Sequence, residues 1–217
     1  MATRLPSVDV VLVGFGWTAS IIAQELTEAG LQVLALERGK DRNTVPDFSS
    51  AHVQDELRYA VRNQNIEAPD RNTLTFRNNR DQQALPMRHI GSFRPAAGVG
   101  GAGVHWNGQC WRFLPQDFVI RDFVTERHGE DFIPEDMQLQ NWGVTYDELE
   151  PYFDAFEYLC GVSGQAGNVG GRIIEGGNPF EGPRARGYPL PPLKRARSTV
   201  LFDDAARNAG FDPFPCP

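Results

Sequence analysis

Two short apolar runs near the N-terminus frame the first regular pattern in the chain. Residues 8–13 form a continuous and largely β-branched run, and residues 31–36 form a second one. Continuous apolar runs of this length are typical of strands buried in a parallel sheet. Between them, small and apolar residues recur at the spacing of one helix face, at Ala19, Ile22, Ala23 and Leu26. The pattern predicts a strand, a helix that Gly30 ends, and a second parallel strand.

The turn after the first run carries the sequence G-x-G-x-x-A. In dinucleotide-binding βαβ units, the first glycine permits a tight turn and the second lets a pyrophosphate approach the backbone. The third position is small so that the helix can pack on the strands. The helix N-terminus then offers N–H groups to the phosphates. We therefore predict a phosphate-binding segment formed by Gly14, Gly16, Trp17, Thr18 and Ala19.

The second apolar run ends on an acid, Glu37. It follows Gly16 by about 20 residues, which is the spacing of an acid that binds ribose hydroxyls. We therefore predict that Glu37 and Arg38 also contact the cofactor. The glycine turn does not separate FAD from NAD, but the run Glu37-Arg38-Gly39 in an N-terminal unit favours FAD. An NAD-dependent dehydrogenase is the alternative.

A second glycine-rich stretch follows at residues 98–107. Its glycines are too dense for the interior of a stable helix or strand, and they let the backbone run close to a flat or bulky group. We interpret it as a second cofactor contact, beneath the reactive ring. The alternative is a glycine-rich turn beside a core tryptophan. The residues of this predicted contact are Gly98, Gly100, Gly101, Gly103, His105, Trp106 and Asn107.

The rest of the chain offers few further strands. Residues 41–93 form a polar insertion, with a short helix expected at 53–61 and a short strand at 74–76. Thr145 and Glu148 form a capping box before a helix whose apolar stripe, at Leu149, Tyr152, Phe153 and Phe156, is expected in the core. Residues 161–192 read as an irregular proline- and glycine-rich crossing, and residues 198–210 as a helix that Ser198 caps.

These elements predict an α/β fold, a Rossmann-like FAD/NAD(P)-binding domain with a doubly wound parallel sheet. The sheet is expected to be incomplete, because no later stretch offers three more clear parallel strands, so we expect a fragment of a longer protein. Residues 1–160 are predicted to form the N-terminal part of the FAD-binding domain. Residues 161–217 are predicted to form the crossing and the start of a substrate or cap domain.

Composition and charge exclude several classes of function. The net charge of −7 argues against nonspecific binding to nucleic acid. No apolar run approaches the ~18 residues of a membrane span, and residues 8–13 are too short for a signal peptide. The three cysteines and four histidines show no metal-ligand spacing, so no metal site is expected here. A modest basic cluster is interpreted as a solvated face rather than a site for an acidic partner: Arg184, Arg186, Lys194, Arg195 and Arg197.

Three segments resemble the glucose–methanol–choline (GMC) family of oxidoreductases. Residues 13–19, with the acid run at 37–39, are similar to the family's FAD-binding start. Residues 100–106 resemble its first signature, whose backbone runs along the isoalloxazine, and residues 142–153 resemble its W…Y…L-x-P-Y-F helix. Within the family, His105-Trp106 and residues 111–113 are similar to the flavoprotein large subunits of bacterial membrane-bound sugar dehydrogenases, of the gluconate 2-dehydrogenase type. Two positions depart from the pattern: Ala102 replaces a small hydroxyl residue, and Trp106 stands where many members have Asn.

The resemblance implies an FAD-dependent oxidoreductase that acts on CH–OH groups of a sugar or sugar acid. A hydride would pass to FAD, and electrons would then reach a cytochrome c subunit and a quinone. A small escort subunit would carry the protein to the periplasmic face of the inner membrane, where only its partners hold it to the membrane; the alternative is the cytoplasm. The family's catalytic histidine and the cysteines of an iron–sulfur cluster would follow residue 217, so no catalytic residue is expected in this chain. Two further functions stay open: an alcohol or choline oxidase that uses oxygen, and a non-catalytic dinucleotide-binding subunit.

Overall fold

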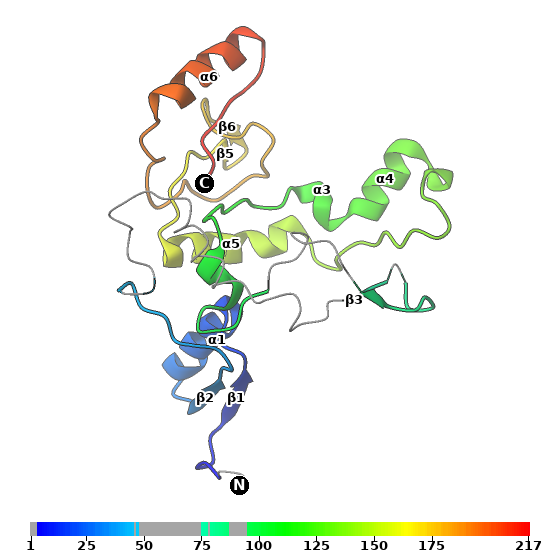
Figure 1. Cartoon of the computed structure of the whole chain (residues 1–217). Helices are drawn as coiled ribbons and strands as arrows, with labels where there is room; N and C mark the ends of the chain where they lie inside the picture. The colour runs from blue at the N-terminus through cyan, green and yellow to red at the C-terminus, as the bar shows by residue number, and fades with distance from the viewer. Residues whose placement is uncertain (1–3, 46, 48–74, 78, 87–94) are drawn as a thin grey trace. The chain divides into compact units, whose positions relative to one another are not determined.

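The computed structural model describes residues 4–45, 47, 75–77, 79–86 and 95–217 (Figure 1). The helix predicted at 53–61 lies outside these ranges. Contacts divide the chain into two compact units, residues 1–107 and residues 108–217. This division lies before the predicted boundary at 160–161, and the assignment of residues 161–217 to a substrate domain stays a prediction. Each unit is described by itself.

Unit 1 begins with the predicted strand–helix–strand pattern. β1 (Val10–Val13) and β2 (Val33–Leu36) pair in parallel, with Val10 opposite Val33 and Val13 opposite Leu36. α1 (Trp17–Glu28) connects them and lies beside the pair in Figure 1. Its end is the expected one, since Gly30 has a φ of +85° and its N–H donates to the Thr27 carbonyl oxygen at 3.0 Å. The βαβ unit is therefore confirmed, whereas the wider doubly wound sheet stays a prediction.

Short elements complete unit 1. β3 (Thr75–Phe76) forms an antiparallel pair with β4 (Leu85–Pro86), so the strand expected at 74–76 is found. The glycine-rich stretch contains η2 (Gly101–His105), a short 3₁₀ helix. This short turn agrees with the expectation that such dense glycines do not form the interior of a stable helix or strand. A single 3₁₀ turn has almost no interior, and the positive φ of Gly100 (+91°) starts it.

Unit 2 is built around helices. α3 (Pro115–Phe118), α4 (Ile120–His128) and η3 (Glu130–Phe132) precede the long helix α5 (Tyr146–Cys160). The antiparallel pair β5 (Asn168–Val169) and β6 (Arg172–Ile173) follows, and then α6 (Arg197–Asn208). The most buried aromatic side chains are Phe118 and Tyr146, and they pack with the rings of Phe113, Trp142 and Phe153.

The N-terminal cap predicted for α5 is found in the structure, whereas the one predicted for α6 is not. Thr145 caps α5 in a capping box: the Glu148 N–H donates to its Oγ1 at 3.3 Å, and the Thr145 N–H donates to Glu148 Oε2 at 2.7 Å. These bonds lower the pKa of Glu148. For α6, however, the predicted cap was wrong. Its N-cap is Ala196, without a side-chain hydrogen bond, and Ser198 lies inside the first turn.

A buried ionic cluster lies on one side of α5. Glu157 and Arg184 are 2% and 1% exposed. Arg112 donates from Nε to Glu157 Oε1 at 2.8 Å and from Nη2 to Glu157 Oε2 at 2.9 Å. Arg184 Nη2 donates to the same Oε2 and stacks its guanidinium on the Tyr188 ring, 3.7 Å from its centroid. Glu157 therefore joins two arginines that lie far apart in sequence.

The solvated basic face predicted for this region was therefore wrong in part. Arg184 is buried in the ionic cluster, Arg186 pairs with Asp154 at 2.7 Å, and Arg195 pairs with Asp203. The reason is that acids project from one face of α5 at positions 150, 154 and 157, which are spaced as i, i+4 and i+7. Glu157 holds Arg184 inside the unit, whereas Asp154 pairs with Arg186 at the surface.

Candidate functional site

The turn between β1 and α1 has the geometry that its glycines predict. Gly14 has a φ of +88°, which L side chains rarely adopt, and its N–H donates to the Leu36 carbonyl oxygen at 2.7 Å. Gly16 is the N-cap of α1, with ordinary angles of φ −80° and ψ −175°. The two glycines therefore differ: the backbone needs the first, and the conformation at the second admits any residue.

The space beside Gly16 is open. A Cβ built on Gly16 would have one protein neighbour within 4 Å among the residues described, the Gly101 Cα at 3.8 Å, which is an ordinary contact. A Cβ on Gly39 would instead overlap the backbone of Gly98, and a Cβ on Gly103 would overlap the Trp17 ring, 2.6 Å from Cδ1. Packing inside the unit thus explains the glycines at 39 and 103 but not the glycine at 16.

The glycine-rich stretch lies directly against this turn. Gly16 and Gly100 form a parallel β-bridge, and the Gly100 N–H donates to the Phe15 carbonyl oxygen at 2.8 Å. A second bridge joins Gly98 to Lys40, just beyond the end of β2. The two segments predicted to contact a cofactor are therefore neighbours in space, although most of unit 1 separates them in sequence.

Glu37 binds the backbone at three places. Its Oε2 accepts from the Phe15 N–H at 2.8 Å, and its Oε1 accepts from the Gly39 N–H at 2.8 Å and from the Gly98 N–H at 3.0 Å. The bond from Phe15 contributes most to a lowered pKa, followed by that from Gly39. Backbone hydrogen bonds from Gly98 and Arg38 lower it further, so main-chain amides take up most of the acceptor positions of this carboxylate.

Two tryptophan rings border the glycine surface. Trp17 and Trp106 meet edge to face, with centroids 5.0 Å apart and an interplanar angle of 90°. Trp106 is 41% exposed, so the alternative of a glycine-rich turn beside a core tryptophan is not what the structure contains. Both rings remain accessible to a ligand.

The other predicted contacts occupy the edges of this site. Thr18 and Ala19 lie in the first turn of α1, and Arg38 is exposed beyond β2. His105 ends η2, and Asn107 is exposed two residues later. Contact of these five residues with a cofactor stays a prediction.

Sequence reasoning missed the parts that the backbone plays here. The Phe15 N–H holds Glu37, and Gly39 permits close packing against Gly98. The signal available for Gly39 was its place two residues after the acid, where the chain must turn away from β2. Nothing in the sequence marks Phe15, because its contribution is a main-chain amide.

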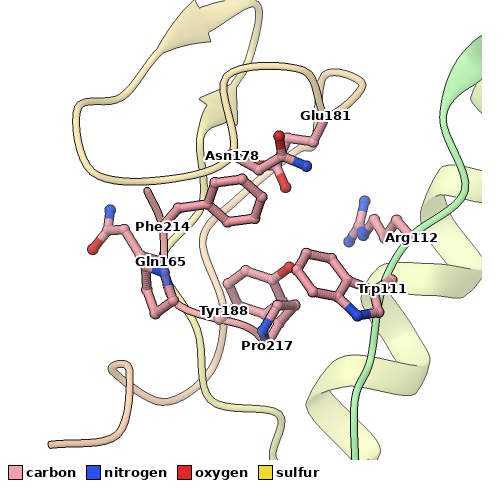
Figure 2. A pocket seen from close by; sticks show the side chains of 9 residues that line it. Trp111, Arg112, Gln165, Asn178, Glu181, Tyr188, Phe214 and Pro217 are labelled. Carbon is pink, nitrogen blue, oxygen red and sulfur yellow. The ribbon is translucent and has the colours of Figure 1, made fainter. Parts of the chain in front are cut away.

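Unit 2 holds a small cavity of about 10 Å³ (Figure 2). Figure 2 shows Trp111 and Arg112 facing Tyr188 and the ring of Phe214 across it. This volume admits about one water molecule, whereas small-molecule sites usually have several hundred Å³. The cavity is therefore not a substrate site in itself. Within the described ranges, no group of three His, Cys, Asp or Glu residues could hold a metal ion, and no helix is long and apolar enough to cross a membrane.

Comparison with curated proteins shows which known proteins the chain is similar to. The chain is 43% identical over its full length to the gluconate 2-dehydrogenase flavoprotein of Pantoea cypripedii and covers 36% of that protein. The chain is a homologue of this flavoprotein. It is also 29% identical, over its full length and 37% of the relative, to the fructose dehydrogenase large subunit of Gluconobacter japonicus. The paromamine 6'-oxidase of Streptomyces fradiae is 29% identical over 96% of the chain and 30% of the relative.

These relatives confirm the predicted resemblance to flavoprotein dehydrogenase subunits and place the chain among homologues of oxidoreductases. The chain spans little more than a third of the length of the first two relatives. No model of a protein family matches it.

Proposed function

We propose that unit 1 binds FAD and that the full-length protein oxidises a CH–OH group of a sugar or sugar acid. The observation that carries the proposal is the open space beside Gly16, where packing among the described residues does not require a glycine. A pyrophosphate that lies against the backbone accounts for that glycine. The flavoprotein relative supports a flavin rather than a nicotinamide as the dinucleotide.

The residues of the site fit this cofactor. The turn from Gly14 to Ala19 and the N-terminus of α1 would hold the phosphates, because a helix N-terminus attracts negative charge. Glu37, at the end of β2, would also contact a ribose hydroxyl, which would share the carboxylate with the backbone amides. The glycine surface at residues 98–103, with Trp106 at its border, would lie along the flavin.

We infer the substrate class from the relatives. Two are dehydrogenases of gluconate and fructose, so a sugar acid such as gluconate is the first substrate to test. The chemistry that bound FAD would supply is acceptance of a hydride from the carbon that carries the hydroxyl group. The chain's own residues bind and orient the cofactor, and we place the base that removes the hydroxyl proton beyond residue 217.

The proposal extends to partners and location. A relative named as a large subunit supports an assembly of several subunits. We propose a cytochrome c subunit as electron acceptor, an iron–sulfur cluster held by cysteines beyond residue 217, and a small escort subunit that carries the protein to the periplasmic face. The test is fractionation of the native host. We expect detergent to release the protein from the membrane fraction together with a haem-containing subunit.

The direct test of the chemistry is an absorbance spectrum of the full-length native protein, before and after gluconate is added without oxygen. Oxidised flavin bands that bleach with gluconate are expected. If the bands bleach only with other sugars or alcohols, the proposed reaction class holds and the substrate is not gluconate. Rapid reoxidation by oxygen favours an oxidase, the activity named for the Streptomyces relative. A protein without flavin overturns the proposal and returns the site to NAD or to a non-catalytic role.

A further inference from the structure

We propose that Glu37 is a positioning residue: its carboxylate joins the glycine turn, the end of β2 and the glycine-rich stretch, and so forms the cofactor surface before any cofactor binds. This role is separate from contact with a ribose. The proposal concerns the protein without ligand, and only its purpose rests on the FAD site proposed above.

The connectivity of Glu37 carries the argument. Three of its N–H donors are 22, 2 and 61 residues away in sequence, at Phe15, Gly39 and Gly98. One side-chain oxygen serves the turn, and the other serves the two segments beyond β2. Gly98 is buried, so its amide would lack a partner without this carboxylate.

The position of these bonds explains what they organise. Phe15 lies between the two glycines of the turn, and its carbonyl oxygen accepts from the Gly100 N–H. Gly98 begins the glycine-rich stretch and forms a bridge with Lys40. Glu37 therefore fixes both sides of the Gly16–Gly100 bridge, which is the surface beside the open space.

The carboxylate is chemically suited to this role, and an amide is not. Both of its oxygens accept from N–H groups, and hydrogen bonds to a charged acceptor are the stronger kind. A glutamine keeps one acceptor and turns an NH₂ group toward the other side. In either orientation a donor then faces a donor, at Phe15 or at the pair Gly39 and Gly98.

The chain offers a matched control in the same unit. The Asp9 Oδ2 accepts from the Gln32 N–H at 2.8 Å and likewise ties the backbone across a gap of 23 residues. This bond needs a single carboxylate oxygen, so an asparagine can place its own oxygen there. Asp9→Asn is therefore expected to keep its bond, whereas Glu37→Gln loses part of its set.

The test is amide hydrogen exchange on the full-length protein freed of its cofactor. In Glu37→Gln, peptides that contain Phe15 or Gly98 are expected to exchange at least about tenfold faster than in the wild type. In Asp9→Asn, the same peptides are expected to exchange at the wild-type rate. Peptides from α1, which lies in the same unit, report whether that unit is folded in each variant.

A second variant provides the test if Glu37→Gln loses protection in α1 as well. Glu37→Asp retains the charge but is one methylene shorter, so it reaches only one side and is expected to lose protection at either Phe15 or Gly98. Unchanged exchange at both peptides, in the glutamine variant or in the aspartate variant, overturns the proposal. If FAD affinity falls while exchange stays unchanged, Glu37 acts on the ribose alone and the FAD site still stands. If exchange rises as expected in a protein without flavin, the positioning role stands and the FAD site fails.

Discussion

Replacing Gly16 by alanine separates cofactor binding from stability. The new Cβ would lie 3.8 Å from the Gly101 Cα, at ordinary backbone angles. Gly103→Ala is the matched comparison, because its Cβ would overlap the Trp17 ring. Both variants add one methyl group to the same site, but only the methyl group at position 103 overlaps protein atoms.

The expected magnitudes follow from these distances. At compatible angles, a glycine-to-alanine change stabilises by about 0.4–1 kcal/mol, and the poorer N-cap costs a similar amount, so the net change for Gly16→Ala is about zero. The methyl group stands where the pyrophosphate approaches the backbone, so FAD affinity is expected to fall at least tenfold, about 1.4 kcal/mol. For Gly103→Ala, overpacking costs about 1–3 kcal/mol in the free protein.

The assay is a thermal melt of the cofactor-free, full-length protein together with an FAD titration. For Gly16→Ala, we expect an unchanged midpoint and weak FAD binding. For Gly103→Ala, a lowered midpoint is expected, by roughly 2–4 °C per kcal/mol for a domain of 150–250 residues. A drop in the midpoint of Gly16→Ala equal to that of Gly103→Ala would refute the open space. Wild-type FAD affinity in Gly16→Ala would refute the placement of the phosphates.

Two further predictions concern unit 2. Glu157→Ala removes the acid that two buried arginines share, whose side chains are 3% and 0% exposed, and leaves Arg112 with Glu150 and Arg184 with Glu181. The expected cost in a urea titration is about 3 kcal/mol, the lower end for a broken buried pair. Asp154→Ala, whose partner Arg186 is 53% exposed, should cost about 1 kcal/mol or less, and equal costs would contradict the buried cluster. Burial raises the pKa of Tyr188 from 10.0 to about 12, so the folded state holds a proton that the unfolded state loses, and stability should fall as the pH rises from about 10 to about 12. Tyr188→Phe should lose less stability than the wild type over this pH range. If the urea midpoints of wild type and variant fall by the same amount between about pH 9 and about pH 11, the raised pKa of Tyr188 is contradicted.

The local parts of the site could be predicted because short patterns determine them. The strand–glycine–helix–strand order follows from apolar periodicity, and the positive φ of Gly14 follows from the tight turn. The capping box at Thr145 is likewise a signal contained in four residues.

The long-range parts could not be predicted for a physical reason. The bridge between Gly16 and Gly100 joins backbones, and main-chain pairing leaves no mark in side-chain identity. The same holds for the three amides that bind Glu37.

The burial of charged side chains in unit 2 was predicted wrongly because the apolar stripe of α5 is a stronger sequence pattern than its acidic face. That stripe was expected in the core, yet Tyr152 is 72% exposed. Phe153 of that stripe does pack in the core, but the acidic face with Glu157 carries buried contacts too, and it holds Arg184. A buried ion pair depends on which segments cross the helix, and nothing near Arg184 in the sequence shows that.

The central claim is that this chain forms an FAD site, and the most direct measurement is the nucleotide released when the full-length native protein is unfolded. Chromatography and mass spectrometry of the released fraction should identify FAD, at about one molecule per chain, as expected for a single βαβ site. Recovery of NAD, or of no nucleotide, from a protein shown to be folded would contradict the account.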